Sequence, residues 1–177
     1  MTQHQHDSIP TRFLSKSAQL VDGFSAVLGE PSLSQDTLVI RDGLLTSSVQ
    51  RGSITCVVHG APQAESVALA MLERYHREGT SFRLDRRING TFLLLDRDKQ
   101  FAVVGRDATG VHHLYLSQLR GQLFVSTRIE PFLGTVCTEL SPIGCDLYLA
   151  YGISITPFPL YQGLHAALPG HCWRLTP

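Results

Sequence analysis

The sequence predicts an α+β fold in which sheets and helices are layered on one another. Short β-branched and apolar runs fill residues 23–60, and a second group of such runs fills residues 91–127. Between the two groups, residues 63–78 follow a helical period, and more helical sequence comes after the second group. Strands grouped on both sides of one helix, with further helix behind them, are typical of this class.

The first group consists of four runs bounded by Gly, Pro, Asp or Ser, at residues 23–29, 37–42, 44–50 and 53–60. Enrichment in β-branched residues between such turn formers predicts strands. An Asp-Gly pair separates the second run from the third, and Asp-Gly is a preferred two-residue hairpin loop.

Residues 63–78 predict an amphipathic helix, because their apolar side chains recur near helical spacing. These side chains belong to Val67, Leu69, Ala70, Leu72 and Tyr75. Gly79 follows as a C-terminal cap. A second short helical turn is expected at residues 81–86, with Thr80 or Ser81 as its N-cap.

The second group predicts four strands in close succession, at residues 91–96, 100–106, 113–117 and 122–127. The turns between them are short and polar, so we expect one antiparallel meander.

Two helical stretches, at 129–133 and 142–151, and a last short strand at 171–175 complete the expected elements.

Composition and length predict one domain without a nucleic-acid or membrane partner. The 177 residues carry 15 basic and 15 acidic side chains, a formal net charge of zero, and a clustered basic surface is not evident. Apolar runs are too short to span a bilayer, and the N-terminus lacks the apolar stretch of a secretory signal. We therefore expect a cytoplasmic protein with an irregular N-terminal tail at residues 1–21.

The four cysteines are widely spaced, which predicts reduced, mostly buried thiols.

The segment at 105–116 contains residues that suggest a metal or acid–base site, and we expect neither. If His112 and His113 lie on a strand, their side chains point to opposite faces and cannot share one metal ion. The other histidines show no ligand spacing. We expect Asp107 to accept hydrogen bonds from turn amides, Gly110 to take a positive φ and Arg106 to pair with a carboxylate.

Two sets of motifs follow one another in order along the chain. The first consists of Tyr75, Phe82, Gly90, Phe92, Arg106, Asp107, Gly110, Leu114 and Tyr115. The second consists of Tyr151-Gly152, Gly163 and Leu168-Pro169-Gly170-His171. In this order the motifs resemble the N-terminal, class II glutamine amidotransferase domain of the asparagine synthetase family.

The resemblance implies a four-layer αββα sandwich of two antiparallel sheets, as in the N-terminal-nucleophile hydrolases. It assigns residues 22–177 to this domain, with 141–177 as the connection toward a synthetase domain that this chain does not contain. In active members the first strand begins with a cysteine, whose own α-amine is the base and whose thiolate attacks the glutamine amide. No cysteine precedes Cys56, and Thr2 lies far before the first predicted strand, so we expect no catalytic nucleophile.

The family's glutamine pocket is altered as well. His59, Gly60 and Ala61 stand where the family has Asn-Gly-Glu, so His59 and Gly60 are the expected remains of a degenerate substrate-binding pocket. Arg106, Asp107 and Gly110 are expected to be structural.

The resemblance therefore implies a glutaminase-inactive domain, similar to those of β-lactam synthetases and lasso-peptide cyclases. Its role would be to support the fold or position a peptide or small-molecule substrate in an ATP-dependent amide-forming enzyme. ATP and Mg are expected only in a partner synthetase domain or subunit. Two alternatives remain open: a glutamine-hydrolysing domain that supplies ammonia for asparagine synthesis, and a stand-alone module that binds a separate synthetase subunit. An exposed apolar patch around Phe158, Leu160 and Tyr161 would favour the module.

Overall fold

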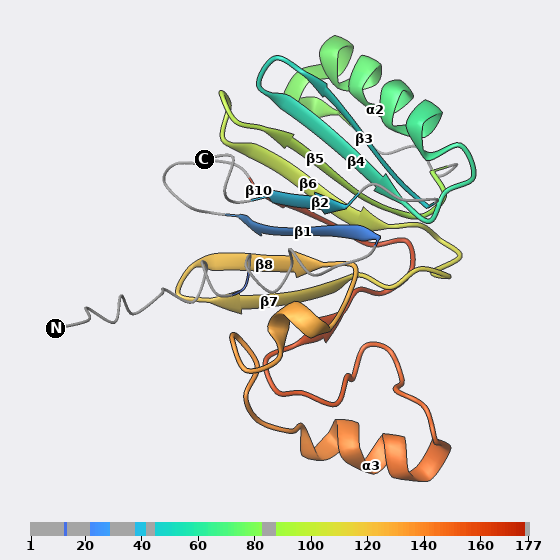
Figure 1. The fold of residues 1–177 in the computed structure, drawn as a ribbon, viewed down its shortest axis with the longest axis vertical. Helices are drawn as coiled ribbons and strands as arrows, with labels where there is room; N and C mark the ends of the chain where they lie inside the picture. The colour runs from blue at the N-terminus through green and yellow to red at the C-terminus, as the bar shows by residue number, and fades with distance from the viewer. Residues whose placement is uncertain (1–12, 14–21, 29–37, 42–44, 83–87, 176–177) are drawn as a thin grey trace, which may run out of the picture.

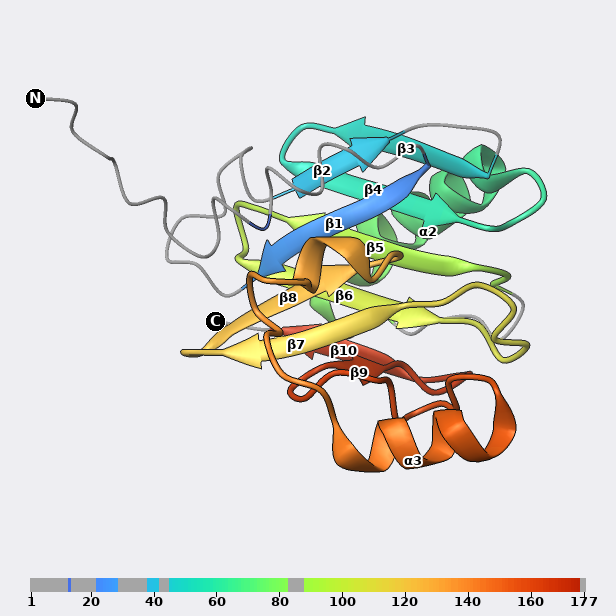
Figure 2. The same ribbon diagram turned by 60° about the horizontal axis from the view of Figure 1, so that its bottom comes forward.

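The computed structural model describes residues 13, 22–28, 38–41, 45–82 and 88–175. Within these residues the chain forms two antiparallel sheets of five strands each and two α-helices (Figures 1 and 2). The α+β class and the sandwich of two antiparallel sheets agree with the sequence-based expectation. No helix in this part of the chain is both long and apolar enough to span a bilayer.

The first sheet has the strand order β10-β6-β5-β4-β3, and we call it the α2 sheet after the helix that covers it. Its strands are β3 (Thr46–Arg51), β4 (Ile54–His59), β5 (Thr91–Asp96), β6 (Phe101–Arg106) and β10 (Cys172–Leu175). Neighbouring residues on its central strands belong to different cores: Leu94 packs beneath α2, and Leu93 and Leu95 face the other sheet. Because both faces are buried, these strands are apolar at consecutive positions instead of alternating.

The second sheet has the strand order β2-β1-β8-β7-β9, and we call it the β1 sheet. Its strands are β1 (Gly23–Leu28), β2 (Leu38–Arg41), β7 (Tyr115–Leu119), β8 (Gln122–Ser126) and β9 (His165–Ala166). Phe24, Ala26 and Leu28 point toward the α2 sheet and share a core with Leu93 and Val104. This core joins the two sheets.

Helix α2 (Ala64–Glu78) covers the outer face of the α2 sheet, as the helical period predicts. Its buried side chains lie on one stripe and are Ala64, Ala68, Met71, Leu72 and Tyr75. The helix ends at Gly79, whose φ is +59° and whose N–H donates to the carbonyl of Tyr75. The left-handed conformation at this cap favours glycine.

Among the described residues, the outer face of the β1 sheet is covered by single aromatic side chains and not, as in the α2 sheet, by a long helix. Val27 and Phe124 pack against Phe13 and Phe132, and Phe13 lies within the predicted tail at 1–21. The rest of that predicted tail lies outside the described residues. Helix α3 (Pro142–Tyr151) stands beyond the sheet edge formed by β7 and β9, so it does not form a fourth layer over the β1 sheet (Figures 1 and 2).

Three sequence-based expectations need correction. The strands of residues 91–127 do not form one meander, because β5 and β6 pair in the α2 sheet whereas β7 and β8 pair in the β1 sheet. Short polar turns predict chain reversal but carry no information about which sheet receives the next strand. Strand β7 begins at Tyr115 instead of His113, and β9 was missed because two residues leave no periodic pattern.

The short elements also differ in detail. A 3-10 turn occupies Gly79–Ser81 and gives way to extended backbone at Phe82, so neither Thr80 nor Ser81 caps a helix that starts there. Residues 83–87 of the predicted turn lie outside the described residues. The helical stretch expected at 129–133 is a 3-10 turn at Glu130–Phe132.

Candidate functional site

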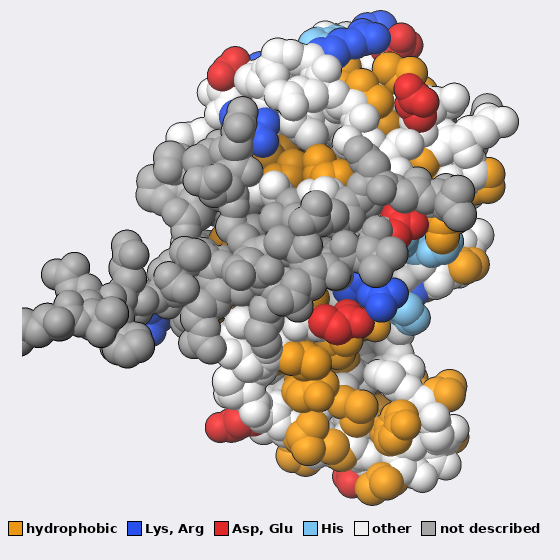
Figure 3. Space-filling view, viewed as in Figure 1, with side chains coloured by type: hydrophobic (Ala, Val, Ile, Leu, Met, Phe, Trp, Pro, Cys, Tyr) orange, Lys and Arg blue, Asp and Glu red, His pale blue; other side chains and the backbone are white. Residues whose placement is uncertain are grey.

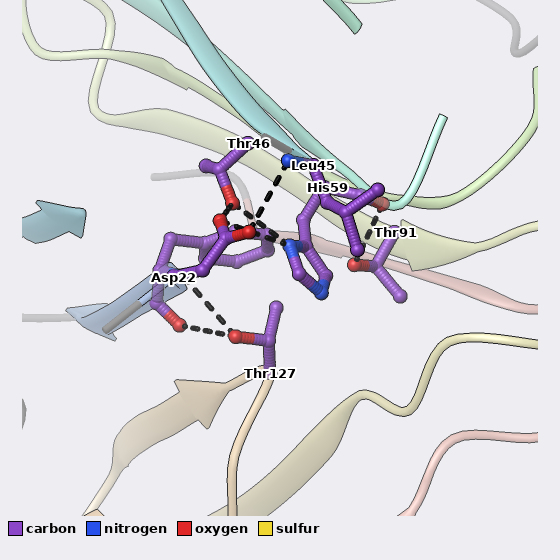
Figure 4. Close-up of polar contacts among 7 residues, drawn as sticks. Asp22, Leu45, Thr46, His59, Thr91 and Thr127 are labelled. Atoms are coloured by element: carbon purple, nitrogen blue, oxygen red, sulfur yellow. Dashed lines mark hydrogen bonds and ion pairs between the residues drawn. The ribbon is translucent and has the colours of Figure 1, made fainter. Parts of the chain in front are cut away.

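Asp22 immediately precedes β1 and connects the two sheets. One carboxylate oxygen, Oδ2, accepts from the backbone N–H of Leu45 at 3.2 Å, and the other, Oδ1, accepts from the hydroxyl of Thr46 (Figure 4). Leu45 and Thr46 lie at the start of β3 in the α2 sheet. The residue at the head of the first described strand is therefore held by the opposite sheet.

Thr46 links Asp22 to His59. Thr46 and His59 are register partners on β3 and β4, and the Thr46 Oγ1 lies 2.8 Å from His59 Nδ1. Because the Thr46 hydroxyl donates its hydrogen to Asp22, its oxygen is left to accept from His59. This places the proton of a neutral His59 on Nδ1 and leaves Nε2 as the free acceptor.

The surroundings of His59 favour its neutral form. Burial lowers the pKa of His59, and the neighbouring His112 and Arg128 lower it further, against the opposing effect of Asp22. Asp22 Oδ1 lies 3.7 Å from His59 Nδ1. A neutral imidazole with an unprotonated Nε2 can act as a general base.

A cavity of about 280 Å³ opens beside His59. Its walls come from the end of β4, the segment before β7 and the segment after β8, and consist of His59, Val111, His112, His113, Tyr115, Thr127, Arg128, Ile129 and Glu130. Arg128 pairs with Glu130 at 3.1 Å, and both side chains are more than half exposed. The cavity thus combines a neutral base with a solvent-accessible guanidinium, which can bind a carbonyl or carboxylate oxygen.

Gly60 and His112 shape one wall of this cavity. Gly60 has a φ of +86°, and a Cβ built there would lie 2.1 Å from Cδ2 of the His112 ring. The rings of His59 and His112 meet edge to face, with their centroids 5.2 Å apart. His59 and Gly60, which the sequence singled out together, therefore lie at the same site, and the ring of His112 lies against the glycine.

The argument that strand geometry separates His112 and His113 does not apply. Both residues precede β7, so the alternation of a strand does not apply, and both line the cavity beside His59. Among the described residues, no three His, Cys, Asp or Glu side chains are arranged to hold a metal ion.

Arg106, Asp107 and Gly110 form a turn whose own residues do not line this cavity. Asp107 accepts from the N–H of Gly110 at 2.6 Å, from the Thr109 hydroxyl at 2.8 Å and from the N–H of Gly90. Although burial opposes it, this set of hydrogen bonds holds the pKa of Asp107 below its usual value. Gly110 has a φ of +62°.

Arg106 has a different partner from the one expected. Its guanidinium donates to the carbonyl of Ala167 at 2.6 Å and to the carbonyl of Gly110, instead of pairing with a carboxylate. Burial lowers the pKa of Arg106. The side chain thus connects the turn to the segment that follows β9.

The thiols do not supply a nucleophile to this site. None of the four free cysteines lines the cavity. Burial raises the pKa of Cys56 to about 12 and that of Cys137 to about 11, so both remain protonated at neutral pH. The hydroxyls that line the cavity belong to Thr127 and Tyr115, and burial raises the pKa of Tyr115.

Several residues of the site were not identified from the sequence. Asp22, Thr46, Thr127, Arg128 and Glu130 reach it from three separate segments that only the fold brings together. One signal was available for Asp22, since the resemblance draws attention to the residue at the head of the first strand. The others carry no local motif.

No protein-family model matches the chain. An amidase from Penicillium rubens, chyE, is 32% identical to it over 108 residues. The matched segment is 59% of this chain but 15% of the amidase, so the similarity concerns a small part of that protein.

Proposed function

We propose that this chain is the glutaminase-inactive N-terminal domain of an asparagine-synthetase-like, ATP-dependent amide-forming enzyme. Its fold would be that of the N-terminal-nucleophile hydrolases. In this role the domain positions a peptide or small-molecule substrate and supports a partner synthetase domain or subunit. ATP and Mg would be bound by that partner, where a carboxylate is activated before an amine attacks it.

The observation that carries the proposal is the identity of the residue at the head of β1. The resemblance predicts there a cysteine with a free α-amine, whereas the residue that immediately precedes β1 in this chain is Asp22. The backbone nitrogen of Asp22 is joined to Val21, so it cannot serve as an amine base. Its carboxylate accepts from Leu45 and Thr46, and a carboxylate held in this way is a poor replacement for a thiolate.

The remaining groups of the site suit binding better than covalent attack. His59 Nε2 can accept a hydrogen bond from a substrate amine or amide, and Arg128 can donate to a substrate oxygen. The ring of His112 against Gly60 reduces the space next to the base. These features support a positioning role in which His59 orients an incoming amine.

The surface of α3 supports the existence of a protein partner. The exposed fractions are 82% for Leu149, 67% for Tyr151 and 63% for Ile153, and Figure 3 shows hydrophobic side chains gathered over this lobe. Of the three residues named beforehand, Phe158 is 47% exposed and Leu160 and Tyr161 are half-buried. Contiguous exposed apolar surface of this kind is typical of protein interfaces.

Ammonia release from glutamine by the purified chain tests the proposal. We expect wild type and the His59→Ala, Asp22→Ala and Thr2→Ala variants to release no more ammonia than a protein-free blank. A glutamine-hydrolysing asparagine synthetase in the same assay establishes the detection limit. Release by wild type that is lost in any of the three variants contradicts the proposal.

Amide hydrolysis is the second candidate, favoured by the neutral base His59 and by the similarity to an amidase. Here His59 Nε2 takes a proton from water, the resulting hydroxide adds to the amide carbonyl carbon, and the C–N bond breaks as the nitrogen receives the proton. Activity that is lost in His59→Ala, reduced in Asp22→Ala because the tautomer of His59 is no longer fixed, and unchanged in Thr2→Ala would select this candidate.

A further inference from the structure

The core between the two sheets is open at one edge. A cavity of about 380 Å³ lies there, where β7 and β9 of the β1 sheet approach β10 of the α2 sheet. It is larger than the cavity beside His59 and shares no residue with it. Its lining consists of Leu116, Ser117, Gln118, Leu123, Pro157, His165, Ala166, Leu168, His171 and Trp173.

The walls of this edge cavity are mainly apolar. Leu116, Leu123 and Trp173 also pack in the core between the sheets, yet Leu123 and Trp173 are only partly buried. The core is therefore incomplete at this edge, and apolar surface remains in contact with water. An apolar molecule inserted between the sheets would bury that surface, which is favourable in proportion to the area removed from water.

The polar side chains at the edge cavity favour an anion over a cation. Its lining contains two histidines and no Asp or Glu. Nδ1 of His171 lies 3.0 Å from the carbonyl oxygen of Pro169, which can only accept, so Nδ1 carries a proton. Nε2 of His171 and a ring N–H of His165 therefore remain available to bind the two oxygens of a carboxyl group.

We propose that the edge cavity binds a small apolar carboxylic acid. Its hydrocarbon or aromatic part lies against Leu116, Leu123 and Trp173, and its carboxylate is held by His165 and His171. The volume corresponds to about a dozen groups the size of a water molecule, which suits a short aryl-alkyl acid. This proposal does not rest on the proposed function, because it concerns different residues.

The single tryptophan of the chain permits a direct test. Trp173 gives one indole N–H resonance in a ¹H–¹⁵N correlation spectrum, and the full chain is titrated with 4-phenylbutyrate or with the matched amine, 4-phenylbutylamine. We expect the acid to shift this resonance saturably, with a dissociation constant on the order of 1 mM for a ligand of this size. The acid should bind about tenfold more tightly than the amine, because a charge-assisted hydrogen bond forms only with the acid.

Variants separate the two parts of the proposal. His165→Ala combined with His171→Ala changes two exposed side chains and should abolish the preference for the acid. Ala166→Leu narrows the edge cavity and should weaken both ligands, whereas Ala70→Leu, in a separate cavity beside α2, should leave binding unchanged. The remaining resonances report whether each variant is folded.

The proposal is overturned by three outcomes. These are the absence of a saturable indole shift up to about 10 mM acid, tighter binding of the amine, and equal binding of both ligands. An acid preference that survives in the double histidine variant would also remove the assigned role of His165 and His171.

Discussion

The hydroxyl oxygen of Thr46 lies 2.8 Å from Nδ1 of His59, and the same hydroxyl donates to Asp22. One threonine therefore connects the carboxylate at the head of β1 to the imidazole at the end of β4. This arrangement fixes the tautomer of His59 and determines which ring nitrogen can receive a proton from a ligand.

Replacing Thr46 by valine should destabilise the protein. The isosteric change removes the hydroxyl, so the part-buried Asp22 and His59 each lose a partner, and the free energy of unfolding should fall by about 1–2 kcal/mol. Urea denaturation at pH 7 measures this free energy of unfolding. Thr46→Ser keeps the hydroxyl and removes only a buried methyl group, so it should lose no more than about 1 kcal/mol. A valine variant as stable as wild type would contradict a stabilising contribution of the hydroxyl.

Stability should decrease as the pH falls below about 6.5, because His59 and His113 have lowered pKa values in the folded protein. Between each folded pKa and the ordinary value of 6.5, the unfolded chain binds more protons than the native one, so the free energy of unfolding rises with pH. Above pH 6.5 neither histidine contributes to this dependence. The window lies well above the pH at which Asp107 and Glu130, whose pKa values are also lowered, become protonated.

Urea denaturation between pH 7.5 and 5.0 measures this effect, with the double variant His59→Asn/His113→Asn as the comparison. We expect the variant to show a smaller loss of stability over this range than wild type. Parallel pH profiles for the two proteins would assign the dependence to other groups.

Gly60→Ala should be strongly destabilising for two separable reasons. The new Cβ would lie 2.1 Å from the His112 ring, and a φ of +86° is unfavourable for alanine. Adding His112→Ala removes the collision and leaves the backbone strain, for which we expect a residual loss of about 1–2 kcal/mol. The measurement is the free energy of unfolding of the two single variants and the double variant. Strict additivity of the two changes would contradict direct contact between Gly60 and His112.

Local sequence patterns identified the strands and α2 because burial on both faces, helical period and turn residues all act over a few neighbours. They could not assign β5 and β6 to one sheet and β7 and β8 to the other, since that depends on how distant strands pair. The candidate site illustrates the same limit. His59 and Gly60 were found from the resemblance, because they stand where the family has Asn-Gly, whereas Asp22 and Arg128 become neighbours of His59 only through the fold.

Asp107→Asn should weaken the turn before β7. The asparagine amide offers a single acceptor oxygen, so the N–H groups of Gly90 and Gly110 can no longer each be paired with a carboxylate oxygen. We expect a loss of about 2 kcal/mol at pH 7, measured by urea denaturation. The control is Asp98→Asn, which changes an exposed carboxylate in the β5–β6 turn and should cost less than about 0.5 kcal/mol. Equal effects at the two positions would remove the special role of Asp107.

Leu149→Asp should change the surface of α3 without changing stability. Leu149 is 82% exposed, and the only charged residue within α3 is Asp146, so the variant adds a charge at the centre of an uncharged apolar surface. We expect the fluorescence of an apolar dye bound to the protein to fall, together with any self-association seen by light scattering at high concentration. The free energy of unfolding should stay within about 0.5 kcal/mol of wild type. Val111→Asp alters an apolar side chain outside α3 that is 71% exposed, and should have a smaller effect on both readouts. A larger effect at Val111 would place the main apolar binding surface beside the His59 cavity instead of on α3.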